Sequence, residues 1–169
     1  AKYRLSDFGR EYNAAFFNSL LKRVDILPVS MVLAQSAEES GWGTSRFAFE
    51  GNALFGQRIW RSASGMKPRL RPKGKRFLVR SFNRLIESVW AYAFNLNTHP
   101  AYADFRAARS SLRLNGGGIE GLKLIGKLGN YSERGEGYIR SIENIIRVNQ
   151  FEEFDGAKLL HLNALPRPF

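Results

Sequence analysis

The chain has 169 residues with a formal net charge of +11 at pH 7, and 44% of its residues are hydrophobic. This size and composition suit one packed domain over residues 1–169 and exclude an intrinsically disordered polymer. No run approaches the roughly 18 apolar residues of a membrane span, so we expect no transmembrane segment. Cysteine is absent, and the two histidines, His99 and His161, lie far apart, so we expect neither a metal site nor a cofactor.

The strong positive charge limits the kinds of partner. Nucleic acid, an anionic membrane surface and an anionic cell-wall polymer would all be attracted to such a protein. The sign of the charge alone does not choose among these three.

Two helices are predicted in the first quarter of the chain. Apolar residues at helical spacing predict a core helix over residues 8–23, capped by Ser6 or Asp7. A second helix begins after Pro28, which a first helical turn tolerates, and ends at Gly41. Its expected buried stripe consists of Val29, Val32, Leu33 and Ala37.

The second helix carries two adjacent carboxylates in its last turn, Glu38 and Glu39. The final carbonyls of a helix are unpaired and carry partial negative charge, so an ionised carboxylate is destabilised there and its pKa rises. Desolvation by apolar neighbours such as Trp42 and Phe55 would raise the pKa further. A glutamic acid protonated near neutral pH can donate a proton to a leaving group, and we assign this role to Glu39. The alternative is that both glutamates are solvated surface residues.

A loop and a basic segment follow. The loop through Asn52, Phe55 and Gln57 is expected to line a cleft, although Asn52 could equally be a turn former. Residues 51–86 contain no Asp or Glu but ten Lys or Arg, and their Gly, Pro and alternation pattern predicts a small basic β-hairpin lobe at about 57–82. This lobe could be a solvated loop, a nucleic-acid patch or a contact for an anionic glycan. Few aromatics are interleaved for base stacking, so we expect no specific nucleic-acid partner.

The remaining chain is predicted to be helical. Helices are expected over residues 83–94, 101–114 and 119–128, with a closing core helix from Tyr138 to Val148. Trp90 and Tyr92 are expected in the core. Arg106, Arg109 and Arg113 are expected on an exposed face. Residues 152–169 are expected to form a C-terminal tail.

Several ordered motifs resemble one known family. They are Ala34-Gln-Ser-Ala-Glu-Glu-Ser-Gly-Trp-Gly43, Ser45-Arg-Phe-Ala48, Asn52-Ala-Leu-Phe-Gly56, Phe94-Asn-Leu-Asn-Thr-His-Pro-Ala-Tyr102 and Asn130-Tyr-Ser132. Together they are similar to the bacterial glucosaminidase family of peptidoglycan hydrolases, most closely to its Bax-type branch. The resemblance implies a mainly α (α+β), lysozyme-like helical domain with the small basic β-lobe beside its cleft.

The resemblance also implies residue roles. The Glu directly before Ser-Gly-Trp-Gly is the catalytic acid of that family, which implies Glu39 rather than Glu38. Tyr131 matches a tyrosine that faces the acid, where its phenol could hold water or the substrate's acetamido group. The remaining residues implied to seat the sugar are Trp42, Asn52, Phe55 and Gln57.

The chain departs from the family pattern in the β-lobe. Many members place a second glutamate level with residues 66–78, and this chain has none there. Either the substrate's own 2-acetamido group attacks the anomeric carbon, or another residue orients water. Glu133 is a weaker candidate for the missing base, and Glu87 is interpreted as a structural acid.

These features predict a peptidoglycan hydrolase that cleaves the N-acetylglucosaminyl linkage. We expect a monomer that acts on glycan strands, with anionic wall or membrane-surface polymers as further partners. The expected location is periplasmic, secreted or wall-associated, with the targeting segment outside this chain. A lytic transglycosylase, a muramidase and a non-catalytic basic module that binds wall or nucleic acid remain alternatives.

Overall fold

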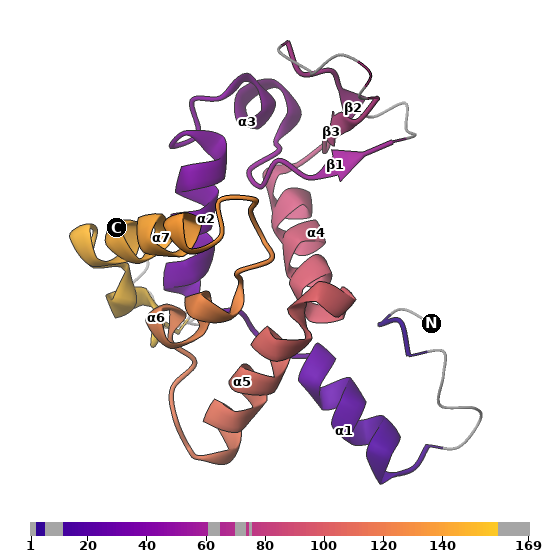
Figure 1. The fold of residues 1–169 in the computed structure, drawn as a ribbon, viewed down its shortest axis with the longest axis vertical. Coiled ribbons are helices and arrows are strands. Elements are labelled where there is room, and N and C mark those ends of the chain that lie inside the picture. Colours follow the sequence, from indigo (N-terminus) through magenta and orange to yellow (C-terminus); the bar gives the residue numbers. More distant parts are fainter. Residues whose placement is uncertain (1–2, 6–11, 61–64, 70–73, 75, 159–169) are drawn as a thin grey trace, which may run out of the picture.

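The computed structural model describes residues 3–5, 12–60, 65–69, 74 and 76–158. A body of helices carries a small antiparallel sheet at one end (Figure 1). The helices are α1 (Ala14–Arg23), α2 (Val29–Ser40), α3 (Arg46–Gly51), α4 (Leu85–Thr98), α5 (Ala103–Leu114), α6 (Gly121–Leu124) and α7 (Glu136–Val148). Short 3-10 helices are η2 (Pro100–Tyr102), η3 (Ile125–Lys127) and η4 (Phe151–Phe154). The expected mainly α (α+β) fold is confirmed.

Helix α2 runs through the interior of the body. It ends at Gly41, which has a left-handed φ of 58°, while the backbone N–H of Trp42 donates to the Ala37 carbonyl at 2.8 Å. This glycine-terminated cap confirms the predicted helix end. The expected buried stripe is largely wrong, because Val29 is exposed and Val32 and Leu33 are half-buried. The buried side chains of α2 are instead Ser30, Met31, Ala34, Gln35, Ala37 and Ser40.

Small residues dominate this buried face because neighbouring segments approach α2 closely. At Gly121, the first residue of α6, an added Cβ would lie 2.1 Å from the Ser30 hydroxyl oxygen. The hydroxyl of Ser30 instead donates to Asp155 at 2.7 Å. At Ser30, close approach of a neighbouring segment therefore favours a small buried residue over a hydrophobic one.

Asp155 caps two helices at once. Its Oδ1 accepts from the backbone N–H of Ser30 at 2.8 Å, and its Oδ2 accepts from the backbone N–H of Gly121 at 2.8 Å. These N–H groups lie in the first turns of α2 and α6, where no carbonyl of the same helix can accept them. The first part of the expected C-terminal tail, from residue 152 to Asp155, therefore packs on the body.

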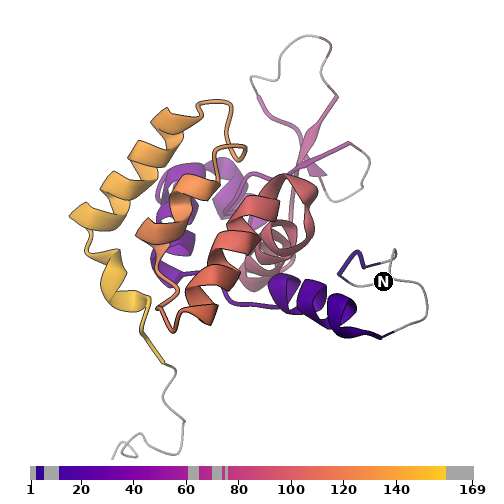
Figure 2. The same cartoon turned by 60° about the horizontal axis from the view of Figure 1, so that its bottom comes forward.

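Helix α1 differs from its prediction. It begins at Ala14, with the side chain of Asn13 accepting from the backbone N–H of Phe16 at 3.0 Å. The caps expected at Ser6 and Asp7 lie outside the described residues. None of the α1 residues is buried, so its expected place in the core is wrong. The helix lies at the edge of the body, as Figures 1 and 2 show.

Helices α4 and α5 correct the assignment of three more residues. Tyr92 of α4 is buried as expected, but Trp90 is 61% exposed because it lies on the opposite face. In α5, Arg106 and Arg109 are buried rather than exposed. Arg106 donates to the carbonyls of Leu96 at 3.0 Å and His99 at 2.8 Å, so the end of α4 accepts its hydrogen bonds.

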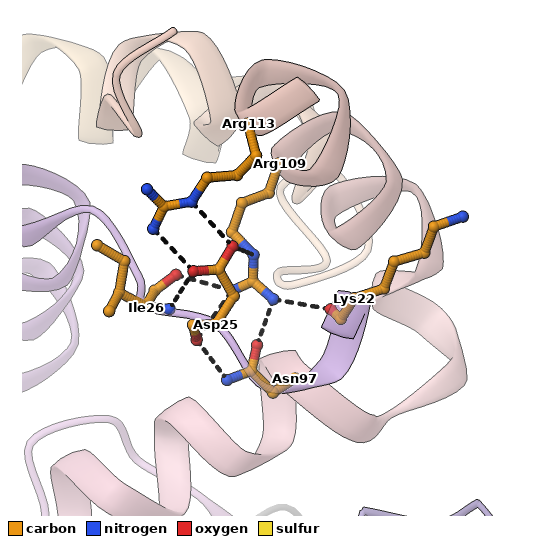
Figure 3. Close-up of polar contacts among 6 residues, drawn as sticks. All are labelled: Lys22, Asp25, Ile26, Asn97, Arg109 and Arg113. Carbon is orange, nitrogen blue, oxygen red and sulfur yellow. Dashed lines mark hydrogen bonds and ion pairs between the residues drawn. The ribbon is translucent and has the colours of Figure 1, made fainter. Parts of the chain in front are cut away.

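The guanidinium of Arg109 is 1% exposed and joins three segments (Figure 3). It donates to the carbonyls of Lys22 and Ile26, each at 2.9 Å, and to Oδ1 of Asn97 at 2.7 Å. Asp25 lies 3.5 Å from its Nε and also pairs with Arg113 at 2.9 Å. Burial lowers the pKa of Arg109 to about 10, which still leaves it charged at neutral pH. The buried positive charge is tolerated because each nitrogen of the guanidinium group faces an oxygen acceptor.

The small sheet comprises β1 (Arg58–Ile59), β2 (Gly65–Met66) and β3 (Leu78–Arg80). The strand order is β1-β3-β2, and both pairings are antiparallel. The β-lobe predicted at about 57–82 contains all three strands, so it is a three-stranded sheet rather than a simple hairpin. The sheet projects from the body beside α3 and the start of α4 (Figures 1 and 2).

Within the described part of the chain, no helix has both the length and the apolar character needed to cross a membrane.

Candidate active site

An open cleft with a volume of about 500 Å³ lies where the helical body meets the β-lobe. Helix α2 contributes Glu39 to its wall. Residues 55–58 lead from α3 into β1 and form one side, and residues 131–134 precede α7 and form another. Tyr92 and Asn95 of α4, together with Tyr102 of η2, complete the lining.

The two adjacent glutamates of α2 have different surroundings. Glu38 is ion-paired with Arg134 and accepts a hydrogen bond from Ser141 Oγ at 3.1 Å. Glu39 lines the cleft, and the side chain of Tyr138 hydrogen-bonds to it. Glu38 is therefore committed to holding the loop before α7, whereas the carboxyl of Glu39 is available to a ligand in the cleft.

A buried chain of hydrogen bonds leads to Glu39. Tyr92 donates its hydroxyl to Oε1 of Gln35, and Nε2 of Gln35 donates to the hydroxyl oxygen of Tyr138 at 2.8 Å. Because the Tyr138 oxygen accepts from Gln35, its own proton can be donated to Glu39. Gln35 precedes Glu39 by four residues, so α2 places both side chains on the same face.

Several groups act on the pKa of Glu39. Desolvation by burial is the largest effect and raises the pKa above its ordinary value of 4.5. The hydrogen bond from Tyr138 lowers the pKa, the charge of Glu38 raises it, and the charge of Arg134 lowers it. The net direction is upward, as the sequence argument predicted. The raised pKa increases the protonated fraction of Glu39, the form that a general acid needs.

Aromatic rings surround this carboxyl. Tyr131 stacks on Tyr138 with centroids 5.5 Å apart and meets Tyr92 edge-on at 6.3 Å. The ring of Phe55 also stacks on the ring of Tyr92, with centroids 3.9 Å apart and an interplanar angle of 11°. Burial raises the pKa of Tyr131 well above its ordinary range, so its phenol stays neutral and can both donate and accept a hydrogen bond.

The backbone also approaches the carboxyl closely. Gly56 has a left-handed φ of 56°, and a Cβ added there would lie 3.8 Å from Oε2 of Glu39. Glycine both permits this turn and leaves room in front of the carboxyl.

The structure brings together four of the six residues expected in the site. Glu39, Phe55, Gln57 and Tyr131 all line the cleft. Asn52 does not line it. Asn52 ends α3 with a left-handed φ of 49°, and its amide donates to the carbonyl of Phe82 at 3.0 Å, which fits the turn-forming alternative.

Trp42 also lies outside the cleft wall. It occupies the turn after α2 with a left-handed φ of 57°, and it is 60% exposed. Of the two apolar neighbours expected beside Glu39, only Phe55 lines the cleft with it, and Tyr131 lines the same cleft.

Sequence reasoning missed the role of Tyr138. It was predicted as a core residue of the closing helix, and it is indeed 1% exposed. The available signal was Gln35, because a polar amide on the interior face of a helix requires buried partners. The sequence could not identify those partners, since Tyr138 is 103 residues away from Gln35.

The remaining acids were also weighed as second catalytic groups. Glu87 accepts from the backbone N–H of Asn83 at 3.2 Å, just before α4, which is consistent with a structural acid. Glu133 lies on the cleft rim with its side chain 96% exposed, 3.9 Å from a guanidinium nitrogen of Arg58. Among the described residues, no group of three or more His, Cys, Asp or Glu side chains is arranged to hold a metal ion.

The chain is 38% identical over 155 residues to the protein Bax of Escherichia coli (strain K12). This alignment covers 87% of the chain and 55% of Bax, so the chain spans about half the length of that relative. No solved structure matches the chain. Residues 14–151 match the Glucosaminidase family, which is described as mannosyl-glycoprotein endo-beta-N-acetylglucosaminidase. The resemblance seen in the motifs is thus confirmed, and the chain belongs to the Glucosaminidase family, a family of glycosidases.

Proposed function

We propose that the protein is a peptidoglycan hydrolase that cleaves the N-acetylglucosaminyl linkage of glycan strands, with Glu39 as the general acid. One observation carries the proposal: Glu39, whose pKa is raised, lines an open cleft and accepts a hydrogen bond from the buried Tyr138. The family match supports the class of substrate. This activity implies a periplasmic or wall-associated location.

The proposed reaction begins with proton transfer from Glu39 to the glycosidic oxygen. As the bond from this oxygen to the anomeric carbon breaks, positive charge develops on the sugar ring. The acetamido carbonyl oxygen of the same sugar attacks the anomeric carbon and forms a cyclic oxazolinium intermediate. Water then opens the intermediate, returns a proton to Glu39 and leaves a hemiacetal with retained configuration.

Cleft residues are assigned to positioning the sugar. The neutral phenol of Tyr131 orients the acetamido group or the incoming water. The ring of Phe55 and the amide of Gln57 line the cleft and seat the sugar. Substrate assistance fits the distribution of acids, because the second carboxylate of the described cleft wall, Glu133, is on the exposed rim.

Purified sacculi test the proposal. The wild-type protein is expected to release soluble fragments, and Glu39→Gln is expected to lower the rate by about 10²- to 10⁴-fold because the glutamine cannot donate a proton. Glu153→Gln removes an exposed carboxylate on η4 and serves as the matched control. Equal clearance by the wild type and Glu39→Gln would refute the role of Glu39.

Product chemistry distinguishes the bond that is cut. After borohydride reduction, mass spectrometry is expected to show reduced glucosamine ends. Reduced muramic ends would indicate a muramidase, and anhydro-muramic ends would indicate a lytic transglycosylase. Strand binding without any release of fragments would leave only a binding module.

A further inference from the structure

A second hollow continues from the catalytic cleft along the β-lobe. It has a volume of about 400 Å³ and shares Gln57, Arg58 and Asn95 with the cleft. The shared residues make the two hollows neighbours, so a polymer that leaves the cleft past Arg58 would enter the second hollow. We call this second hollow the arginine groove.

The arginine groove is lined by Arg4, Arg58 and Arg80, and its described wall carries no carboxylate. Arg58 lies 3.9 Å from the exposed Glu133. Among the described residues, no ion-pair partner lies within 4.0 Å of Arg4 or Arg80. Three guanidinium groups around one hollow create a positive potential that favours an anionic ligand.

The arginines come from segments that are held in place. Arg23 donates to the carbonyls of Tyr3 and Arg4, each at 2.8 Å, which ties the N-terminal segment to α1. On the β-lobe, the backbone N–H of Arg80 donates to the Gln57 carbonyl at 2.9 Å. These contacts fix the backbones that carry Arg4 and Arg80 beside the cleft.

Aromatic rings restrict two of the guanidinium groups. Arg58 lies over the ring of Phe77 at 4.6 Å, and Arg80 lies over the ring of Phe82 at 4.8 Å. Such contacts limit the rotamers of exposed arginines and reduce the entropy lost when an anion binds.

We propose that the arginine groove is a subsite for a carboxylate carried by the glycan strand. This rests on the proposed function. N-acetylglucosamine alternates with N-acetylmuramic acid in peptidoglycan, so the sugars next to a cleaved N-acetylglucosamine bear a lactyl group or a peptide stem with carboxylates. A guanidinium fork matches a carboxylate in geometry and charge. The groove thus selects carboxylate-bearing strands over neutral polymers of N-acetylglucosamine.

Binding in an inactive background tests this subsite. Glu39→Gln is combined with Arg4→Gln and Arg80→Gln, and affinity for fluorescently labelled, peptide-bearing glycan strands is measured at fixed salt. The two substitutions are expected to weaken binding about tenfold. The matched control replaces Arg140 and Arg147, which are exposed on α7 and line neither the groove nor the cleft, by glutamine and is expected to change affinity less than about twofold.

Chemical variants of the strand identify the ligand. Amidation of the strand carboxylates with ethanolamine is expected to weaken binding by Glu39→Gln. The affinity difference between Glu39→Gln and the variant that also carries Arg4→Gln and Arg80→Gln, called the arginine variant, should then disappear. With peptide-free strands that keep the lactyl carboxylate, a persisting advantage would place the lactyl group in the groove. If that advantage is lost with peptide-free strands, the ligand in the groove is a carboxylate of the peptide stem. Acid treatment removes phosphate-bearing wall polymers from the strands. If the carboxylate is the ligand, Glu39→Gln should still bind these treated strands more tightly than the arginine variant does.

Three outcomes would overturn the subsite. They are an unchanged affinity of the arginine variant, an equal loss in the control variant, and a loss that persists with amidated strands. Thermal unfolding of each variant separates weakened binding from misfolding. Sacculus clearance by the wild type is measured separately, so an inactive wild type refutes the proposed function while the binding results still decide the subsite.

Discussion

Gln35 and Tyr138 are joined inside the protein by a hydrogen bond of 2.8 Å in which the amide donates and the phenol accepts. Gln35 also accepts from Tyr92, so both ends of its amide are used. This arrangement leaves the Tyr138 proton for Glu39. The hydrogen bond to the proposed acid, Glu39, is thus supported by Gln35 and Tyr138, neither of which lines the cleft.

Tyr138→Phe tests this relationship. Because the hydrogen bond from Tyr138 lowers the pKa of Glu39, its loss should raise that pKa and move the basic limb of the kcat/KM profile to higher pH. The variant also leaves the buried Gln35 amide without its acceptor, which costs about 1–3 kcal/mol. Sacculus hydrolysis across pH and urea unfolding provide the measurements. Tyr12→Phe alters an exposed ring and is the control. An unmoved basic limb would show that Tyr138 serves packing alone.

Glu39→Gln should change stability in a pH-dependent way. The fold raises the pKa of Glu39 above 4.5, so the folded state holds this proton more tightly than the unfolded state. The wild type therefore loses stability as the pH rises from 4.5 through the pKa of Glu39 in the folded state. The glutamine variant has no charge to desolvate at this position, so its stability does not change in this way. Urea unfolding should find the variant more stable than the wild type near about pH 7, with the difference shrinking below about pH 4. A difference independent of pH would contradict the assigned desolvation.

Tyr131→Phe should separate positioning from packing. The ring that stacks on Tyr138 remains, whereas the phenol that is proposed to orient water or the acetamido group is lost. We expect kcat on soluble glycan strands to fall about 10²-fold with little change in KM, because the loss is felt in the transition state. Melting temperature should stay close to that of the wild type. Wild-type kcat in this variant would assign Tyr131 to the wall of the cleft only.

Arg109→Met should destabilise the protein by about 3–5 kcal/mol. The substitution keeps much of the side-chain volume but leaves Asp25 and the Asn97 oxygen without their buried partner. Arg113→Gln is the matched control, since Arg113 is 48% exposed and its pair with Asp25 should be worth less than about 1 kcal/mol. Urea unfolding compares the two. Equal losses would mean that burial of Arg109 does not determine its contribution.

Asp155→Ala should cost about 2–4 kcal/mol, because two helices lose a charged cap. The backbone N–H groups of Ser30 and Gly121 and the Ser30 hydroxyl would all lose their acceptor. Glu153→Ala, on the exposed side of η4, is the control and should change little. Hydrogen exchange should locate the loss in the first turns of α2 and α6. Protection that falls only near residues 151–158 would contradict the double cap.

Local signals predicted the elements that local chemistry determines. Pro28 and Gly41 marked the ends of α2, and the motif around Glu39 indicated the acid that lines the cleft. Arg109 of α5 was wrongly expected to be exposed, because its burial depends on the carbonyls of Lys22, in the last turn of α1, and Ile26, in the connection after it. No pattern within α5 reports on acceptors more than 80 residues away.

The same limit applies to the site. Phe55 and Gln57 were predicted from the loop that follows Asn52 and do line the cleft. The amide of Asn52 itself donates instead to the carbonyls of Phe82 and Asn83, just before α4. Both roles suit a polar residue in a turn. Only the position of the Phe82 carbonyl decides between them, and that position depends on how the β-lobe folds back.

The bond from Ser30 to Asp155 spans 125 residues and secures the beginning of α2, the helix that carries Glu39 in its last turn. During synthesis, the ribosome must therefore release nearly the whole domain before that helix acquires its anchor. An interrupted chain that stops short of Asp155 would contain every residue proposed for the chemistry. It would lack the carboxylate that caps the first turn of α2, the helix that carries Glu39. The proposed hydrolytic activity would then appear only when translation of the domain is essentially finished.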